Sequence, residues 1–169
     1  MEGNPFTQFV FQIFIFCAIL IIGYTCNFYY LAFLSSHRKD KNSVVEVGEP
    51  TITIQLPIYN EKYVATRLVD AVCQQDYPKD KMRIMVLDDS DDDTVTTMSN
   101  TVKKYQNLGF DIQHVRRGTR NGYKAGALKH AMKSTDSEFV AIFDADFIPP
   151  NWYLKKAMPH FAKSNIGLV

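Results

Sequence analysis

Two aspartates near the end of the sequence have the spacing of a metal or phosphate site. Asp144 and Asp146 flank one alanine directly after the apolar run FVAIF. Carboxylates placed in this way can offer oxygen ligands to Mg²⁺ or Mn²⁺, and such an ion can bridge phosphate oxygens. A lone Asp-x-Asp is common, and alone it is better explained as a solvated turn after a strand. The other charged segments described below favour a ligand site.

A second acidic cluster, DDSDDD, spans residues 88–93. Asp91, Asp92 and Asp93 precede a helix-like segment, where aspartate caps free amides and suits the helix dipole, so we assign them mostly this structural role. Asp88 and Asp89 end a strand-like run and are the functional candidates. A carboxylate there can accept a hydrogen bond from a nucleobase or help to hold a metal. The spacing excludes an EF-hand, whose loop needs glycine where Asp93 stands.

A basic segment with three glycines, RRGTRNGYKAG, covers residues 116–126. It matches neither G-x-G-x-x-G nor a P-loop, because Lys124 is followed by alanine rather than serine or threonine. A lysine at the start of a helix, beside exposed amides, is suited to a diphosphate. An ordinary basic turn is the alternative. We favour a functional role for Lys124 and leave Arg116, Arg117 and Arg120 open.

Strand-like and helix-like segments alternate from Pro50 onward, and they must position these side chains. We expect strands at 51–56, 83–88, 111–116 and 139–144, and helices at 61–74, 92–106 and 124–133. This alternation predicts β-α-β units and a mainly parallel sheet with helices on both faces. Ligands of such sheets bind at the carboxyl ends of the strands, where the charged segments fall. The sequence therefore predicts an α/β fold with one composite site.

The segment from Phe9 to Leu34 has no charged residue and exceeds the roughly 20 residues that cross a bilayer, so it predicts a transmembrane helix. A cleaved signal peptide is the alternative, but no positive charge precedes the apolar run. Basic residues follow it, whereas only Glu2 precedes it, which places the C-terminal side in the cytosol. These basic residues are His37, Arg38, Lys39 and Lys41.

We therefore expect four parts in the chain. Residues 1–8 form a short extracytoplasmic N-terminus, 9–34 the transmembrane helix, 35–49 a juxtamembrane linker and 50–169 the folded nucleotide-binding region. The last residues, IGLV, look like the start of another strand, so we expect the folded region to be incomplete at its C-terminus.

Composition excludes several classes of function. The formal net charge of +1, with basic and acidic residues intermixed, argues against nucleic-acid binding. The three cysteines are odd in number and contain no C-x-x-C, so neither a disulfide framework nor a zinc site is indicated.

Four segments together resemble a known family: QLPIYNE, VLDDS, RNGYKAGALK and AIFDADFIP. Their order and approximate spacing are similar to those of family 2 glycosyltransferases of the cellulose synthase-like type, and most similar to the glucomannan 4-β-mannosyltransferase (CslA-like) group. The resemblance covers residues 50–161. It implies a GT-A fold, a nucleotide-binding α/β sandwich. It also implies inverting transfer of a hexose from a nucleotide-sugar to a glycan acceptor, in β-mannan or β-glucan synthesis.

The resemblance implies roles for seven residues in binding the donor: Tyr59, Glu61, Asp88, Asp89, Lys124, Asp144 and Asp146. Tyr59 and Glu61 would line the nucleoside pocket, and Lys124 would approach the diphosphate. Asp88 and Asp89 would contact the base and support the metal. Asp144 and Asp146 would also bind Mg²⁺ or Mn²⁺, which would offset charge on the leaving nucleoside diphosphate. The donor would be of the GDP-mannose or UDP-glucose class, and the active face would lie on the cytosolic side of a cell or Golgi membrane.

Two later motifs of the family, T-E-D with its general base and Q-x-x-R-W at the acceptor site, do not occur before Val169. The catalytic residues are therefore expected beyond Val169. One alternative stays open: a catalytically incomplete, membrane-tethered nucleotide-sugar-binding module or remnant. A haloacid dehalogenase-type phosphatase is disfavoured. Its nucleophile motif resembles Asp-Ala-Asp-Phe-Ile, but that motif normally ends the first strand, whereas here it ends the fourth predicted strand.

Overall fold

The structure is a computed structural model that describes residues 4–37, 48–162 and 166–169. The chain divides into two units, residues 1–43 and 44–169. The basic residues Arg38, Lys39 and Lys41, and most of the predicted linker, lie outside the described residues.

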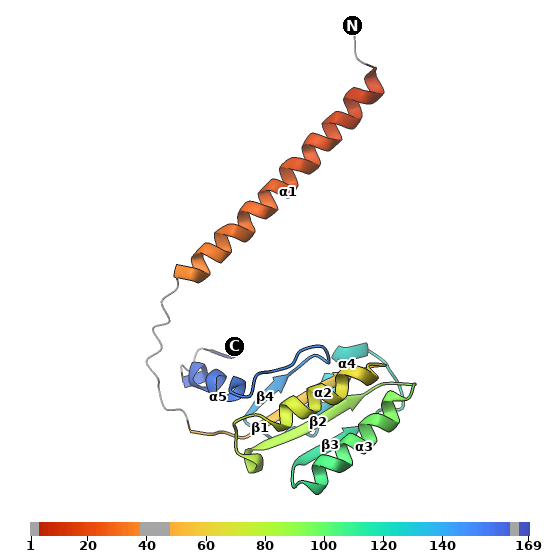
Figure 1. Cartoon of the computed structure of the whole chain (residues 1–169), viewed down its shortest axis with the longest axis vertical. Helices are drawn as coiled ribbons and strands as arrows, with labels where there is room; N and C mark the ends of the chain where they lie inside the picture. The colour runs from red at the N-terminus through yellow and green to blue at the C-terminus, as the bar shows by residue number, and fades with distance from the viewer. Residues whose placement is uncertain (1–3, 38–47, 163–165) are drawn as a thin grey trace. The chain divides into compact units, whose positions relative to one another are not determined.

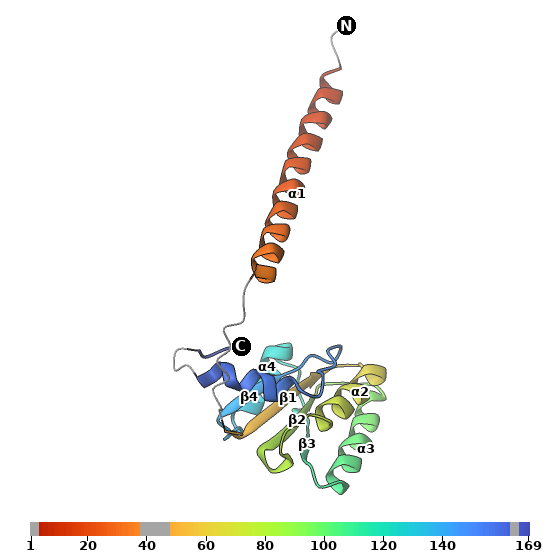
Figure 2. The same cartoon turned by 60° about the vertical axis from the view of Figure 1, so that its left-hand side comes forward.

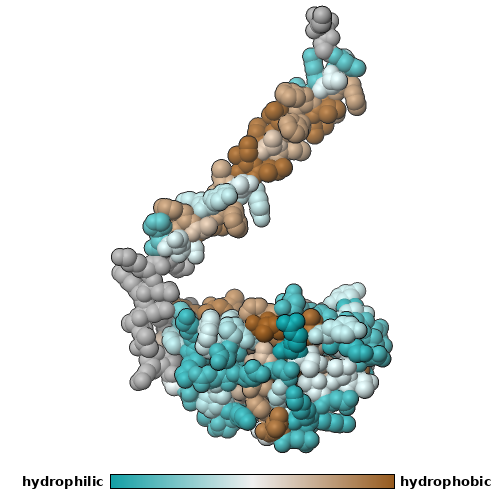
Figure 3. All heavy atoms as spheres, in the orientation of Figure 1, coloured by the Kyte–Doolittle hydropathy of each residue, from teal (hydrophilic) through white to brown (hydrophobic). Residues whose placement is uncertain are grey.

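The first unit contains one long helix, α1 (Pro5–His37), of 33 residues. It contains the predicted transmembrane segment and extends past both ends of it. Proline suits the first turn of a helix, and the side chain of Asn4 accepts a hydrogen bond from the Phe6 amide at 3.0 Å. At about 1.5 Å per residue the helix is roughly 50 Å long, more than the hydrocarbon core of a bilayer. None of its residues is buried, and Figure 3 shows apolar side chains along most of its length.

The second unit is built on a parallel sheet in the order β3-β2-β1-β4. Its strands are β1 (Ile52–Ile58), β2 (Met82–Asp88), β3 (Asp111–Val115) and β4 (Phe139–Ile142). All four predicted strands are confirmed, although β4 ends two residues early. Because β4 pairs with β1 only as far as Gln55, no strand among the described residues lies beside the last residues of β1 on that side. Pro57, which lacks an amide hydrogen, is tolerated there.

Helices cover both faces of the sheet, as predicted (Figure 1 and Figure 2). The helices α2 (Lys62–Cys73) and α3 (Thr94–Asn107) pack on one face, and α4 (Tyr123–Met132) packs on the other. Short elements complete the unit: η1 (Lys79–Lys81), α5 (Tyr153–Ala157) and η2 (Met158–Ala162).

Side chains alternate between the two faces of each strand, and this alternation divides the core into two clusters. On β2, Ile84 and Val86 belong to the large cluster under α2 and α3, whereas Met85 and Leu87 pack against α4. Successive side chains of a strand point to opposite faces, so one apolar run serves both helical layers. Each fully buried aliphatic side chain contributes about 1.5–3 kcal/mol, and this double burial holds the strand ends in place.

The expectation of a strand at the C-terminal IGLV is wrong for this structure, where residues 166–169 are irregular. A strand requires a neighbour that takes up its amide and carbonyl groups, and these residues pair with no described strand.

Candidate functional site

The seven residues expected to bind the donor meet at one rim of the sheet, around two adjoining cavities. The first, of about 350 Å³, opens beside the free end of β1. It is lined by six of the seven: Tyr59, Glu61, Asp89, Lys124, Asp144 and Asp146. The second, of about 440 Å³, is lined by the seventh, Asp88, and by the loop that follows β3. Tyr59, Asp89 and Arg120 line both cavities, so the two form one continuous surface.

Three carboxylates make one corner of the first cavity strongly acidic. Burial of Glu61 and the nearby charges of Asp146 and Asp144 raise the pKa of Glu61 above its ordinary value. Asp144 forms an ion pair with Lys124, and both side chains are about half exposed. Among the described residues, none donates a hydrogen bond to Asp146. The corner therefore favours an added cation, and Asp146 is the carboxylate most available to it.

Among residues 4–37, 48–162 and 166–169, no group of three or more His, Cys, Asp or Glu side chains is placed to hold a metal ion alone. Two carboxylates nevertheless fit an ion such as Mg²⁺, which is usually held by one or two carboxylates together with substrate phosphates. Asp144 and Asp146 offer hard oxygen donors of this kind. The residues present therefore fit a divalent ion that is completed by a diphosphate ligand.

Asp89 is held by Arg117 in a two-pronged ion pair. The Nε and Nη2 atoms of Arg117 donate to the two carboxylate oxygens at 2.9 and 2.5 Å. Both side chains are nearly buried, with exposed fractions of 11% for Arg117 and 8% for Asp89. The hydrogen bonds that Arg117 donates to Asp89 raise the pKa of Arg117, so the pair stays charged. Asp89 thus holds the following loop in place as well as lining the cavity.

Arg117 also sets the conformation of the loop before α4. It donates to the carbonyl oxygens of Asn121 at 2.8 Å and Tyr123 at 2.9 Å. Gly126 is required beneath this arrangement, because a Cβ there would collide with the Asn121 carbonyl and lie 2.6 Å from Nη1 of Arg117. Gly122, with φ of 73°, supplies the left-handed turn that starts α4. These contacts therefore fix the conformation of the basic glycine-rich segment, which places Lys124 at the rim.

Asp88 is fully buried, and both of its oxygens are occupied. Oδ2 lies 2.7 Å from Nε2 of His114, and Oδ1 accepts the Ser90 amide at 2.9 Å. Burial opposes ionisation of Asp88, but the hydrogen bonds from His114 and Ser90 outweigh it and lower the pKa below its ordinary value. The Asp88 carboxylate is therefore a fixed, ionised part of the cavity floor.

Tyr59 lies between the two cavities, and a cation covers its ring. The guanidinium carbon of Arg120 is 3.3 Å from the centre of the Tyr59 ring and 5.0 Å from that of Tyr123. Stacking of this kind places a positive charge at the junction of the cavities. Of the three arginines left open by the sequence, Arg120 is thus the one that lines both cavities.

The helix-capping role predicted for Asp91, Asp92 and Asp93 is confirmed only in part. Asp92 accepts the Thr94 amide at 2.9 Å, as a residue at a helix start does. Asp93 is the N-cap residue of α3, but its side chain makes no capping hydrogen bond and pairs instead with Lys62 at 3.2 Å. Asp91 exchanges two hydrogen bonds with Asn60, at 2.8 and 3.1 Å. Asp91 therefore ties two strand-end loops together.

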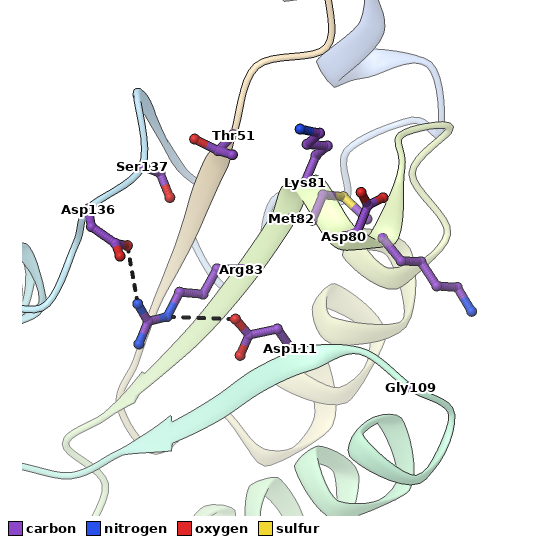
Figure 4. A pocket seen from close by; sticks show the side chains of 10 residues that line it. Thr51, Asp80, Lys81, Met82, Arg83, Gly109, Asp111, Asp136 and Ser137 are labelled. Carbon is purple, nitrogen blue, oxygen red and sulfur yellow. Dashed lines mark hydrogen bonds and ion pairs between the residues drawn. The ribbon is translucent and has the colours of Figure 1, made fainter.

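A further hollow, of about 570 Å³, lies at the opposite edge of the sheet, where the strands begin (Figure 4). Its charges neutralise one another, since Arg83 lies 3.3 Å from Asp136 and 3.9 Å from Asp111. No residue predicted to bind the donor lines it.

Sequence reasoning missed His114, to which it assigned no role, and it did not identify the partners of Arg117. The signal for His114 lies in the register of β2 and β3, which places His114 opposite Val86 and thus on the same face as Asp88, two residues further along.

Comparison with known proteins shows what the chain is similar to. The family model described as Glycosyl transferase family 2 matches residues 53–169. A probable glucomannan 4-beta-mannosyltransferase 10 of Arabidopsis thaliana is 42% identical over 122 residues, which cover 68% of this chain. The chain spans 22% of the length of that relative.

Solved structures share the fold. The mannosyltransferase PcManGT from Pyrobaculum calidifontis, in complex with GDP-Man and Mn²⁺, superposes with a TM-score of 0.72 at 27% identity, over 86% of this chain and 42% of that one. S. aureus TarS 1-349, in complex with UDP-GlcNAc, gives a TM-score of 0.58 at 26% identity, over 66% of this chain and 31% of that one. The predicted GT-A fold is thereby confirmed.

Proposed function

Because the chain belongs to glycosyltransferase family 2, we propose that its second unit binds a nucleotide-sugar and forms the donor-binding part of an inverting hexosyltransferase. The observation that carries this proposal is the joined pair of cavities, around which all seven expected donor-binding residues lie. The product would be a polysaccharide of the β-mannan or β-glucan type, as the name of the Arabidopsis relative suggests. A donor-binding module without transfer activity is the second candidate, because the matched region is 22% of that relative.

The shape of the surface suggests how the donor lies. The nucleoside would occupy the cavity floored by Asp88, with its base near the ring of Tyr59. The diphosphate would then cross the junction, where Arg120 and Lys124 offer positive charge. Lys124 is long and half exposed, so it can leave Asp144 and turn toward a phosphate. The sugar would reach the acidic corner at Glu61.

Asp144 and Asp146 are proposed to hold the divalent ion. When bound, Mg²⁺ or Mn²⁺ would stabilise negative charge on the departing diphosphate. The two carboxylates would hold the ion at the acidic corner of the first cavity. When the donor binds, Lys124 would leave Asp144, and the Asp144 carboxylate would then be available to the ion.

Mannose is the sugar best supported. PcManGT, whose structure contains GDP-Man and Mn²⁺, covers more of this chain and superposes more closely than TarS with UDP-GlcNAc. The Arabidopsis relative is likewise named as a mannosyltransferase. We therefore propose GDP-mannose as the donor, with a UDP-sugar such as UDP-glucose as the alternative.

Calorimetric titration tests this proposal directly. The full chain in detergent would be titrated with GDP and with UDP, each with and without Mn²⁺. We expect GDP to bind at least about tenfold more tightly with Mn²⁺ than without it, and more tightly than UDP. Tighter binding of UDP would overturn the mannose assignment. A folded chain that binds neither nucleotide at millimolar concentration would overturn the donor site itself.

We further propose that α1 anchors the protein in a membrane with the second unit in the cytosol. Within the part of the chain that is described, α1 is the one helix long and apolar enough to span a bilayer. The proposed parts are those expected from the sequence: an extracytoplasmic N-terminus (1–8), a membrane helix (9–34), a linker (35–49) and the donor-binding region (50–169).

Protease protection checks this topology. In sealed microsomes, whose cytosolic face is outward, a tag at the C-terminus should be digested and a tag at the N-terminus should be protected until detergent is added. Equal digestion of both tags would show that the helix does not span the membrane. Protection of the C-terminal tag alone would show the opposite orientation, against the excess of basic residues after α1.

A further inference from the structure

His114 lies beneath the second cavity, where it contacts Asp88 on the cavity floor. It is on β3, with an exposed side-chain fraction of 15%, and its Nε2 lies 2.7 Å from Oδ2 of Asp88. The carboxylate of Asp88 is ionised and can only accept hydrogen bonds, so Nε2 of His114 must carry the proton. Asp88 therefore depends on His114 for one of its two oxygens and on the Ser90 amide for the other.

Hydrogen bonds continue from Asp88 to the loop that carries Tyr59. The hydroxyl of Ser90 accepts the amide of Asn60 at 2.9 Å, and Ser90 is itself buried. Asn60 has a φ of 54°, in the left-handed region, which asparagine adopts more readily than most residues other than glycine. The chain His114, Asp88, Ser90, Asn60 thus ends at the residue next to Tyr59.

We propose that His114 is a positioning residue for the nucleoside: through Asp88 and Ser90 it fixes the loop that presents Tyr59 to the base. The inference rests on the proposed function, since it assumes a nucleoside in the cavity that Asp88 floors. It assigns His114 no contact with the ligand. Loss of the hydrogen-bond donor at position 114 would leave one oxygen of the buried Asp88 carboxylate without a partner, and the carboxylate would turn or take up water.

Two substitutions separate hydrogen bonding from packing. His114→Gln keeps an N–H group near the position of Nε2. His114→Phe keeps an aromatic ring but has no N–H group to donate a hydrogen bond. The matched control is His130→Phe, because His130 is exposed on α4 and makes no contact with Asp88. Each full-length variant would be studied by hydrogen exchange without ligand and by titration with GDP and UDP in Mn²⁺.

For His114→Phe, we expect amide exchange in peptides that cover residues 58–61 and 88–91 to be about tenfold faster, and nucleotide binding to be about tenfold weaker. His114→Gln should retain both properties within about threefold, and His130→Phe should change neither. The exchange measurement uses no nucleotide, so it reports on the hydrogen-bonded chain even if the proposed donor site is wrong.

Three results would overturn the inference. Unchanged exchange in His114→Phe would show that His114 does not hold the loop. Faster exchange with unchanged nucleotide affinity would show that the loop does not govern binding. Equal losses in His114→Gln and His114→Phe would show that only packing matters. A wild-type chain that binds no nucleotide would instead overturn the proposed function, and with it the assignment of a nucleoside to this cavity.

Discussion

Arg117→Ala should lower the free energy of unfolding by about 3–5 kcal/mol, because it leaves the Asp89 carboxylate charged and nearly buried without a partner. The substitution also removes two hydrogen bonds to the carbonyl oxygens of Asn121 and Tyr123. Urea unfolding followed by tryptophan fluorescence measures this loss. Trp152 is the only tryptophan in the sequence and lies in the second unit, so the signal reports on that unit alone.

Lys62→Ala is the matched control for this experiment. It removes an ion pair with Asp93 of 3.2 Å whose side chains are 40% and 85% exposed, and such pairs contribute about 0–1 kcal/mol. Arg117→Lys should restore only part of the stability, since an ammonium group cannot donate to both Asp89 oxygens and two carbonyls from one plane. A loss in Arg117→Ala no greater than that in Lys62→Ala would show that the buried pair does not hold the loop.

The positions of the strands and the location of the site could be predicted because both follow from short-range patterns. Short β-rich runs that alternate with helix-like segments indicate parallel strands, and the carboxyl ends of parallel strands fall at one edge of the sheet. Charged segments that follow four such runs must therefore meet, whatever the loops between them do. This reasoning needs no knowledge of which side chains pair.

Pairing of side chains could not be predicted in the same way, because it depends on register and loop conformation. Asp88 and Asp89 are adjacent and chemically identical, yet one is bound by His114 on β3 and the other by Arg117 in the loop beyond it. Alternation along β2 turns the two carboxylates to different sides. From the sequence, Asp88 and Asp89 are one candidate. In the structure, Asp88 is the buried floor of the second cavity, whereas Asp89 holds the loop before α4 through Arg117.

Short local signals also misled at two places. Asp93 has the residue type of a helix cap, but Lys62 competes for its carboxylate across the loops. IGLV has the composition of a strand, but strands form by pairing, and composition does not supply a neighbour. In each case a contact between distant segments, or its lack among the described residues, decided the outcome.

Asp146→Asn should abolish the effect of Mn²⁺ on nucleotide binding and weaken the affinity for GDP in Mn²⁺ by at least about tenfold, to the value measured without metal. Asparagine keeps the size of the side chain but removes the charge and one oxygen ligand. Asp144 cannot fully replace it, because Asp144 is paired with Lys124, whereas Asp146 accepts no hydrogen bond from the described residues. Titration with GDP, with and without Mn²⁺, measures both affinities.

The control for this experiment is Asp136→Asn, which removes an exposed carboxylate at the opposite edge of the sheet and should leave both affinities unchanged. The comparison of metal-free affinities is decisive, because Asp146→Asn should not weaken binding there and should even strengthen it slightly, since a negative charge near the diphosphate is removed. If instead the variant lost affinity equally with and without Mn²⁺, Asp146 would act as a direct contact or a structural residue. Asp144 and Asp146 would then not form the metal site, and the positive charge needed beside the diphosphate would have to come from Lys124 and Arg120 alone.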